Sequence, residues 1–287
     1  MENINIIGQK KLLQRIQRLI DSDRYPRFSI IVGAKGSGKK KIARLLCKEI
    51  SGGLYEECGT KIDDVRELIH DAYQIHSTAV YFIPDADNMS VAAKNALLKV
   101  TEEPPNNAYF IMTLEDENNT LETIRSRGTV FHMDRYTPDE ILEYCADNHF
   151  NEDDENYEKK ENIIKELCET PGDVEILWNS NPLEFYDYVQ LVVDNIAEVS
   201  LANAFKIPSK IALKEDAEGY DLRLFWKAFM RVLMYKSLTF DCEAEQILQY
   251  GNAVMVTSKY LQKLKVKGIN RSMLMDNWVL EIRELWQ

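Results

Sequence analysis

The most informative segment of this sequence is Gly33-Ala-Lys-Gly-Ser-Gly-Lys-Lys40. It follows Phe28-Ser-Ile-Ile-Val32, an apolar, β-branched run that is typical of a buried strand. It fits the phosphate-loop pattern G-x-x-x-x-G-K-[ST] at every position but the last. In such a loop, backbone N–H groups and the positive end of the next helix hold phosphate. The stretch therefore predicts a P-loop domain in which a nucleotide's phosphates face Gly33, Gly36, Gly38 and Lys39.

The eighth loop position holds Lys40, where Ser or Thr normally offers a hydroxyl oxygen to Mg²⁺. An ammonium group has three donors and no lone pair, so it cannot ligate a cation and would repel one. Phosphoryl transfer needs a metal ion that bridges the β- and γ-phosphates. The loop therefore predicts a phosphate cradle that lacks one anchor for the metal.

Outward from the loop, three more short apolar runs read as buried strands, at residues 80–83, 109–113 and 129–133. Helical spacing of apolar residues predicts helices over 12–20, from the loop to about Glu49, and over 89–100, the last ending at Pro104-Pro105. Strands that alternate with helices imply a parallel sheet covered on both faces.

Beyond Arg135 the strand signals fade. Thr137-Pro-Asp-Glu140 has the features of a helix start, with Thr as N-cap and Pro at the first helical position. We predict three domains: an α/β core over 1–135, a small helical lid over 136–180, and an all-helical C-terminal domain over 181–287.

Composition excludes few classes of protein but sets useful limits. The 287 residues carry a net charge of −12, which argues against a protein that wraps DNA alone. Residues 1–48 differ from the rest of the chain because they carry twelve Lys/Arg and only three acidic residues.

No apolar run is long enough to span a membrane and the first residues lack an apolar signal region, so we expect a cytoplasmic protein. Five scattered cysteines (Cys47, Cys58, Cys145, Cys168 and Cys242) predict reduced, mostly buried thiols.

The segment Val80–Pro105 (VYFIPDADNMSVAAKNALLKVTEEPP) closely resembles the clamp-loader family of AAA+ proteins, which includes the gamma and delta-prime subunits of bacterial DNA polymerase III. Asn95–Pro105 is similar to the hallmark helix of that family and the turn after it. Thr123-Ile-Arg-Ser-Arg-Gly128 resembles its Ser-Arg-Cys motif, with Gly128 in place of Cys, and Gly268–Leu285 resembles its last collar helix. The resemblance implies that residues 181–287 form such a collar.

The resemblance also locates the acidic pair that serves Mg²⁺ and water in active relatives. Aligning Ala86 with the family places Pro84 at the metal-associated Asp and Asp85 at the water-activating Glu. A slip of one residue would give Asp85 the first role and leave Ala86 in the second. Either alignment breaks the pair.

Several further residues acquire roles by the same resemblance. Ile6 and Ile7 match the segment that contacts adenine, and Thr113 matches the first polar sensor. Pro171-Gly-Asp-Val174 offers no Arg where active relatives often carry one. Arg127 matches the arginine finger that reaches a neighbour's γ-phosphate, with Arg125 as a nearby rival. The segment 48–61 is too short and too poor in cysteine for the family's four-cysteine zinc module, so we expect neither zinc nor another metal.

These departures favour a delta-prime-like subunit that does not hydrolyse ATP itself, and that binds ATP or ADP weakly at most. The implied partners are gamma-type and delta subunits, a sliding clamp, and primer-template DNA reached through the assembled complex. Two alternatives stay open. One is a gamma-type ATPase that ligates its metal through Asp85 or Asp87; the other is a stand-alone DNA-binding AAA+ loader, which the acidic net charge and the lack of a helix-turn-helix pattern disfavour.

Overall fold

The computed structural model describes residues 6–53, 55–149, 155–213, 218–238, 243–264, 266 and 268–286. The chain divides into two compact units. The first comprises Met1–Glu140 with Thr170–Gly172, and the second comprises Ile141–Glu169 with Asp173–Gln287.

The first unit is built on a five-stranded, fully parallel sheet with strand order β2-β3-β4-β1-β5. The strands are β1 (Phe28–Val32), β2 (Glu56–Glu57), β3 (Ala79–Ile83), β4 (Ala108–Leu114) and β5 (Thr129–His132). The predicted parallel sheet is therefore confirmed, and four of its strands coincide within a residue or two with the apolar runs of the sequence. Because both faces are covered, β1, β3 and β4 are mostly apolar rather than alternating, whereas the edge strand β5 (Thr-Val-Phe-His) is apolar only at its centre.

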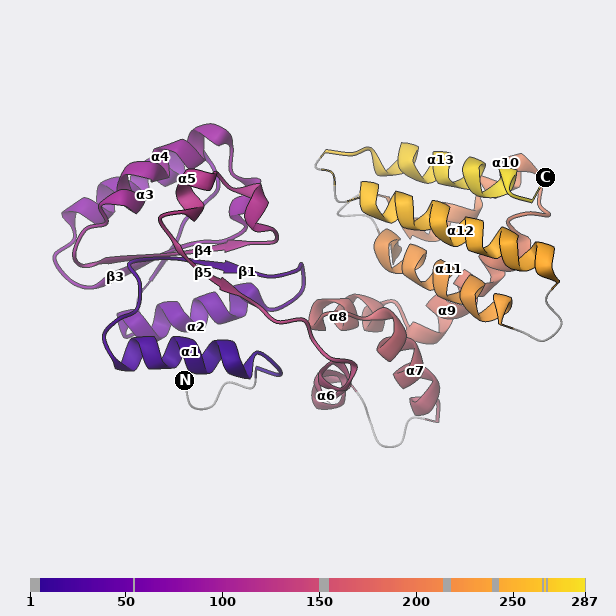
Figure 1. Cartoon of the computed structure of the whole chain (residues 1–287), viewed down its shortest axis with the longest axis horizontal. Helices are drawn as coiled ribbons and strands as arrows, with labels where there is room; N and C mark the ends of the chain where they lie inside the picture. The colour runs from indigo at the N-terminus through magenta and orange to yellow at the C-terminus, as the bar shows by residue number, and fades with distance from the viewer. Residues whose placement is uncertain are drawn as a thin grey trace. The chain divides into compact units, whose positions relative to one another are not determined.

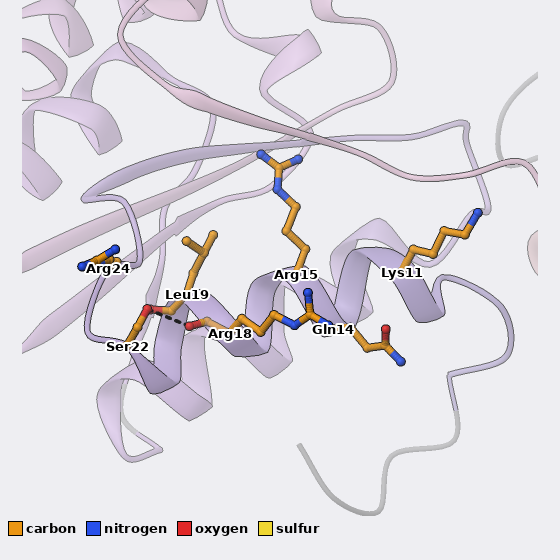
Figure 2. A pocket seen from close by; sticks show the side chains of 7 residues that line it. All are labelled: Lys11, Gln14, Arg15, Arg18, Leu19, Ser22 and Arg24. Carbon is orange, nitrogen blue, oxygen red and sulfur yellow. Dashed lines mark hydrogen bonds between the residues drawn. The ribbon is translucent and has the colours of Figure 1, made fainter.

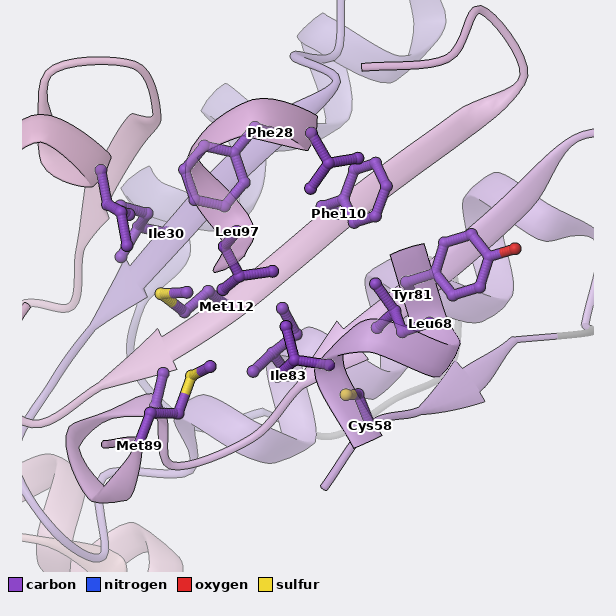
Figure 3. Packing of buried hydrophobic residues seen from close by; sticks show 14 of the residues in the cluster. Phe28, Ile30, Cys58, Leu68, Tyr81, Ile83, Met89, Leu97, Phe110 and Met112 are labelled. Atoms are coloured by element: carbon purple, nitrogen blue, oxygen red, sulfur yellow. The ribbon is translucent and has the colours of Figure 1, made fainter. Parts of the chain in front are cut away.

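Two layers of helices bury the sheet (Figure 1). α1 (Lys10–Asp21) and α2 (Lys39–Ser51) pack on one face, where Ile16 and Leu46 meet Ile31 and Phe131. α3 (Ile62–Gln74), α4 (Val91–Glu102) and α5 (Glu122–Arg125) cover the other face. There, Leu68 and Leu97 pack with aromatic and aliphatic strand residues that include Phe110 and Met112 (Figure 3).

Some elements of the first unit are absent from the sequence-based prediction. β2 has only two residues, both exposed, so it carries no apolar signal. The 3₁₀ turns η1 (Ala86–Asn88) and η2 (Glu117–Asn119) are equally short. Met89, assigned to the next helix from its spacing, lies one residue before the N-cap Ser90, whose hydroxyl accepts a hydrogen bond from the Ala93 N–H.

The predicted helix start at Thr137 is confirmed as a capping box. The Thr137 hydroxyl accepts from the Glu140 N–H at 3.2 Å, and the Glu140 carboxylate accepts from the Thr137 N–H at 2.9 Å. α6 (Pro138–Asn148) begins here and continues into the second unit. The helices that follow are α7 (Tyr157–Leu167), α8 (Pro171–Asn179), α9 (Pro182–Asn195), α10 (Leu201–Ala204), α11 (Leu222–Ser237), α12 (Ala244–Lys263) and α13 (Arg271–Glu284).

The second unit is mainly helical, as expected, although the 3₁₀ turn η3 (Ile207–Lys210) and a two-stranded sheet of β6 (Ile211–Ala212) and β7 (Tyr220–Asp221) interrupt the helices. Its core is aromatic: Phe229 lies edge-on to Trp278 with ring centroids 4.9 Å apart, and the Trp278 N–H donates to the buried Thr257 hydroxyl at 3.1 Å. Nothing in the structure tests the division into lid and collar, which stays a prediction.

Two further expectations concern the whole chain. Cys47, Cys58, Cys145 and Cys168 are free and buried, whereas Cys242 lies outside the described residues. Among the helices that the structure describes, none has the length and apolar character required to cross a membrane.

Candidate phosphate-binding site

The glycine-rich turn joins β1 to α2 and has the backbone that a phosphate loop requires. Gly36 and Gly38 have φ of 80° and 83°, a left-handed conformation that glycine adopts at little cost. A Cβ on Gly33 would lie 2.8 Å from the Ser37 hydroxyl and 2.9 Å from the Met133 sulfur. All three predicted glycines are therefore needed for the shape of the turn.

Lys39 follows Gly38 at the first position of α2 and is buried, with only 4% of its surface exposed. Its ammonium donates to the Ala34 carbonyl at 3.3 Å and lies 4.0 Å from a carboxylate oxygen of Glu115. Burial lowers the pKa of this ammonium, and the carboxylates of Glu115, Asp85 and Asp87 oppose that shift. The side chain thus sits inside the loop as the sequence predicts, and Glu115 is a partner that the sequence did not reveal.

Lys40 is placed quite differently. Its ammonium forms a direct ion pair with the Asp85 carboxylate, which comes from the turn after β3. Asp85 has a left-handed backbone with φ of 48°, and its N–H donates to the Thr113 hydroxyl at 3.0 Å. The structure therefore brings three predicted site residues, Lys40, Asp85 and Thr113, into one connected group.

Asp87 is one of the two acids, with Asp85, through which the gamma-type alternative could ligate its metal, and its carboxylate is bound by neighbouring amide groups. Its carboxylate accepts from the Glu115 N–H at 2.8 Å and from the Asn119 side-chain amide at 2.9 Å. A carboxylate that accepts several N–H groups is held firmly in one orientation. Asp87 therefore ties η1 to the chain that leaves β4.

These residues do not fit a Mg²⁺ ion. Pro84 offers no side-chain oxygen, the Lys40 ammonium lies on Asp85, and the Asp87 carboxylate binds amides. Across the described ranges, no group of three or more His, Cys, Asp or Glu side chains is arranged to hold a metal ion. The glycine turn with Lys39, in contrast, keeps the donors that a phosphate needs.

The carbonyl groups of the loop are bound by other parts of the chain. The Tyr136 hydroxyl donates to the Ser37 carbonyl at 2.8 Å, and the Gly172 N–H donates to the Gly36 carbonyl at 3.0 Å. Burial raises the pKa of Tyr136 to about 12, so the phenol remains a neutral donor at neutral pH. The Thr170 hydroxyl adds a longer contact, 3.4 Å, to the Lys35 carbonyl.

The backbone at Gly172 comes very close to the phosphate loop. A Cβ on Gly172 would lie 2.5 Å from the Gly36 Cα, so residue 172 must be glycine while this backbone contact persists. The segment Pro171–Val174, which contains no arginine, therefore contributes a backbone contact to the loop.

The segment predicted to face adenine lies beside Tyr136. Ile7 is buried, and Ile6 packs partly against the α1–α2 core. The next residue, Gly8, approaches Tyr136 so closely that a Cβ would lie 3.0 Å from the ring. Tyr136 therefore links the adenine-side segment to the phosphate loop, a role that local sequence patterns did not indicate.

Arg127 lies at the end of α5 and binds within its own chain. Its guanidinium pairs with Glu102, the last residue of α4, and donates to the Thr123 carbonyl at 2.6 Å. The rival Arg125 donates to the Asn118 amide oxygen at 3.4 Å. Gly128, which replaces the family's Cys, is packed on β1, where a Cβ would lie 2.8 Å from the Phe28 ring.

Over part of its length, this chain is similar to subunits of DNA polymerase III. Residues 54–137 match the family described as "DNA polymerase III, delta subunit". The chain is 28% identical over 169 residues to DNA polymerase III subunit gamma of Buchnera aphidicola subsp. Schizaphis graminum, an alignment that covers 48% of this chain and 47% of that protein. It is 27% identical over 159 residues to the tau subunit of Escherichia coli, covering 45% and 25% of the two chains.

A replication factor C subunit shows a similar identity and coverage. The small subunit of replication factor C from Halobacterium salinarum is 26% identical over 155 residues, which is 50% of this chain and 48% of that protein. The chain thus aligns with at most about half the length of these curated relatives. The shared sequence establishes homology to the gamma and tau subunits over that part.

Solved structures extend the likeness in fold. A gamma subunit-related protein of DNA polymerase III from Thermotoga maritima superimposes with a TM-score of 0.51 at 16% identity, covering 96% of this chain and all of that one. A point mutant of RuvB from the same organism gives a TM-score of 0.50 at 15% identity, covering 87% and 83%. At these identities the likeness concerns the fold alone, which is AAA+-like.

Proposed function

We propose that this chain is a delta-prime-like subunit of a DNA polymerase III clamp loader, and that it does not hydrolyse ATP itself. The observation that carries the proposal is the ion pair between Lys40 and Asp85. Lys40 carries an ammonium group at the loop position where active relatives offer a hydroxyl oxygen to magnesium, and this ammonium engages the carboxylate of Asp85. Homology to the gamma and tau subunits supplies the context of a clamp loader.

The nucleotide site keeps only part of its chemistry under this proposal. The turn with Gly33, Gly36, Gly38 and Lys39 still offers donors to phosphate, whereas Lys40, Asp85 and Asp87 bind protein groups. We expect weak binding of ATP or ADP at most, with no dependence on Mg²⁺. In active relatives, magnesium neutralises the charge that develops on the phosphates during hydrolysis. Under the proposal, this chain does not carry out that metal-assisted hydrolysis.

Arg127 would be the contribution of this chain to catalysis by its neighbours. A guanidinium is permanently charged and planar, which suits phosphate recognition across an interface. In the proposed loader, Arg127 completes the ATP site of a gamma-type subunit, residues 181–287 join a helical collar, and the delta subunit, sliding clamp and primer-template DNA are met in the assembled complex. Such a loader works in the cytoplasm.

Turnover of ATP by the purified full chain tests the proposal directly. We expect phosphate release in the presence of Mg²⁺ to stay at the background of a no-protein control, while a purified gamma subunit assayed in parallel turns over. Mg²⁺-dependent release well above background, lost in the Lys39→Ala variant, would overturn the non-hydrolysing assignment.

That second outcome would favour a gamma-type ATPase. Two observations support this alternative: the curated relatives include gamma and tau subunits, and the chain retains the buried Lys39 together with Thr113 at the end of β4. The hydrolysis assay separates the two candidates because only the alternative requires a functional metal site in this chain.

A further inference from the structure

A hollow of about 470 Å³ lies beside α1, and its lining shares no residue with the candidate phosphate-binding site. Figure 2 shows its lining. Four of the seven lining residues are cationic, two are neutral and polar, and one is apolar; in chain order they are Lys11, Gln14, Arg15, Arg18, Leu19, Ser22 and Arg24. We call this hollow the α1 groove. No acidic residue is among those that line it.

The four cations of the α1 groove have no carboxylate partner among the described residues. Within the part of the chain that the structure describes, none of the four forms an ion pair. Arg15 lies over the Phe131 ring, 5.2 Å from its centroid, a contact that leaves the positive charge in place. The acid at the end of the helix, Asp21, accepts a hydrogen bond at 2.7 Å from the neutral side chain of Gln17.

This cluster stands out against the charge of the whole chain. The protein has a net charge of −12, yet it gathers four cations around one hollow. Lys11, Arg15 and Arg18 follow one another at spacings of four and three residues, which places like charges side by side on a helix and disfavours the isolated helix. An anionic ligand would relieve that repulsion.

The shape of the cluster favours a polymer of phosphates over a single small anion. At a rise of 1.5 Å per residue, Lys11 and Arg18 are about 10 Å apart along the axis of α1. A row of cations at that length can meet successive phosphates of one strand. Three of the four cations are arginines, whose forked donors suit phosphate oxygens.

A protein partner fits the groove less well. Leu19 is the one apolar side chain in its lining, whereas protein interfaces usually have an apolar, aromatic-rich centre. Gln14 and Ser22 add neutral polar groups of the kind that contact phosphate and sugar.

We propose that the α1 groove binds the sugar-phosphate backbone of nucleic acid, without sequence selectivity. The proposal rests on the charge and geometry of α1 alone, so it does not depend on the clamp-loader assignment. The acidic remainder of the chain weakens the interaction. We therefore expect the α1 groove to bind the nucleic-acid backbone only at low or moderate salt concentration. This binding is weaker than the binding that a stand-alone DNA loader would need.

The test uses the purified full chain and fluorescently labelled 20-nucleotide DNA, single-stranded and duplex, with anisotropy measured over a salt series. We expect binding at low salt to two unrelated sequences with equal affinity. Each phosphate contact contributes about −0.7 to the slope of log K against log salt for single strands, so four contacts give a slope of about −2.8. Unlabelled poly-glutamate serves as the competitor that represents an acidic protein segment.

The decisive variant is Lys11→Glu combined with Arg18→Glu, which spares Arg15 because that residue packs on Phe131. Loss of two contacts should reduce the magnitude of the slope by about 1.4 and the affinity at low salt by about tenfold or more. The matched control, Lys159→Glu with Lys165→Glu, changes the net charge equally at exposed positions on α7. It should bind as the wild type does, and circular dichroism of all three proteins establishes that they are folded.

Three results would overturn the proposal: no binding by the wild type at 50 mM salt, equal loss in the control variant, or displacement of DNA by poly-glutamate at lower concentration than by unlabelled DNA. All three are measured on the isolated chain. Failure here therefore leaves the clamp-loader proposal standing, and ATP hydrolysis by the chain would leave the α1 groove unaffected.

Discussion

The ammonium of Lys40, at the start of α2, pairs with the carboxylate of Asp85, in the turn that follows β3. The pair joins the two segments that would supply oxygen ligands to magnesium in an active P-loop enzyme. Thr113 supports it from β4 by accepting the Asp85 N–H at 3.0 Å. Together, the ion pair and this hydrogen bond connect the start of α2, the turn after β3, and β4.

Lys40→Thr tests whether the hydroxyl alone is missing. We expect Mg²⁺-dependent ATP hydrolysis by this variant to remain at background, because Pro84 still offers no oxygen to the metal. Phosphate release from the purified variant is the measurement, with Lys39→Ala as the control for background. A rise of tenfold or more over that control would show that Asp85, once freed from Lys40, suffices to hold the metal.

Arg127→Ala tests the finger in a reconstituted loader that contains this chain. Arginine fingers contribute about 10³–10⁵ in rate, so hydrolysis at the neighbouring site should nearly vanish. The ATPase of the complex should then fall to the share supplied by its other sites, while gel filtration shows unchanged assembly. Arg125→Ala is the matched control, and unchanged turnover in Arg127→Ala would refute the role.

Glu102→Gln tests whether the ion pair with Glu102 restrains Arg127 within its own chain, before Arg127 reaches the neighbouring subunit of the proposed loader. The pair is partly exposed, with 29% of the Arg127 side chain and 56% of the Glu102 side chain accessible, so its loss should cost less than about 1 kcal/mol of stability. Reaching a neighbour's phosphate requires Arg127 to leave Glu102. Removal of the charge should therefore preserve or raise the ATPase of the loader, and a fall comparable to that of Arg127→Ala would assign Glu102 a direct part.

Local sequence determined most of the first unit because its signals are local. β1, β3 and β4 are mostly apolar runs, β5 has an apolar centre, and the capping box at Thr137 and Glu140 lies within four residues. β2 escaped prediction because two exposed glutamates pair with β3 through their backbone alone. α3 was also missed, although Val65, Leu68 and Ala72 recur at helical spacing and could have revealed it.

The sequence named candidate site residues but did not reveal their contacts. The phosphate-loop pattern singled out Gly36, Lys39 and Lys40, the family resemblance singled out Asp85 and Thr113, and the structure connects Lys40, Asp85 and Thr113. The contact of Tyr136 with Ser37 spans 99 positions, and that of Gly172 with Gly36 depends on the close approach of two backbones. Such contacts arise from tertiary packing, so neither the phosphate-loop pattern nor helical periodicity could reveal them.

The buried cysteines give a prediction that depends on pH. Burial raises the pKa of Cys47, Cys58 and Cys145 to about 12 each. Unfolded thiols titrate near 8.5, so at pH 8 the native thiolate fraction is smaller by about 10³. Native alkylation by iodoacetamide, mapped by peptide mass, should be slow at these three sites and fast in urea. Rapid native labelling of Cys58 would show that the α3–α4 face of the sheet opens readily.

The raised pKa values of the buried thiols also determine how the stability of the protein changes with pH. Because the native state keeps protons that the unfolded state releases, the contribution is complete below about pH 8.5 and is lost as the pH rises towards 12. We expect the urea midpoint to fall between pH 8.5 and pH 10. Cys58→Ala should reduce the steepness of that fall relative to the wild type, since one raised thiol is removed, although its cavity lowers the midpoint at every pH. An unaltered pH dependence in the variant would show that other buried groups, such as the Tyr136 phenol, govern alkaline unfolding.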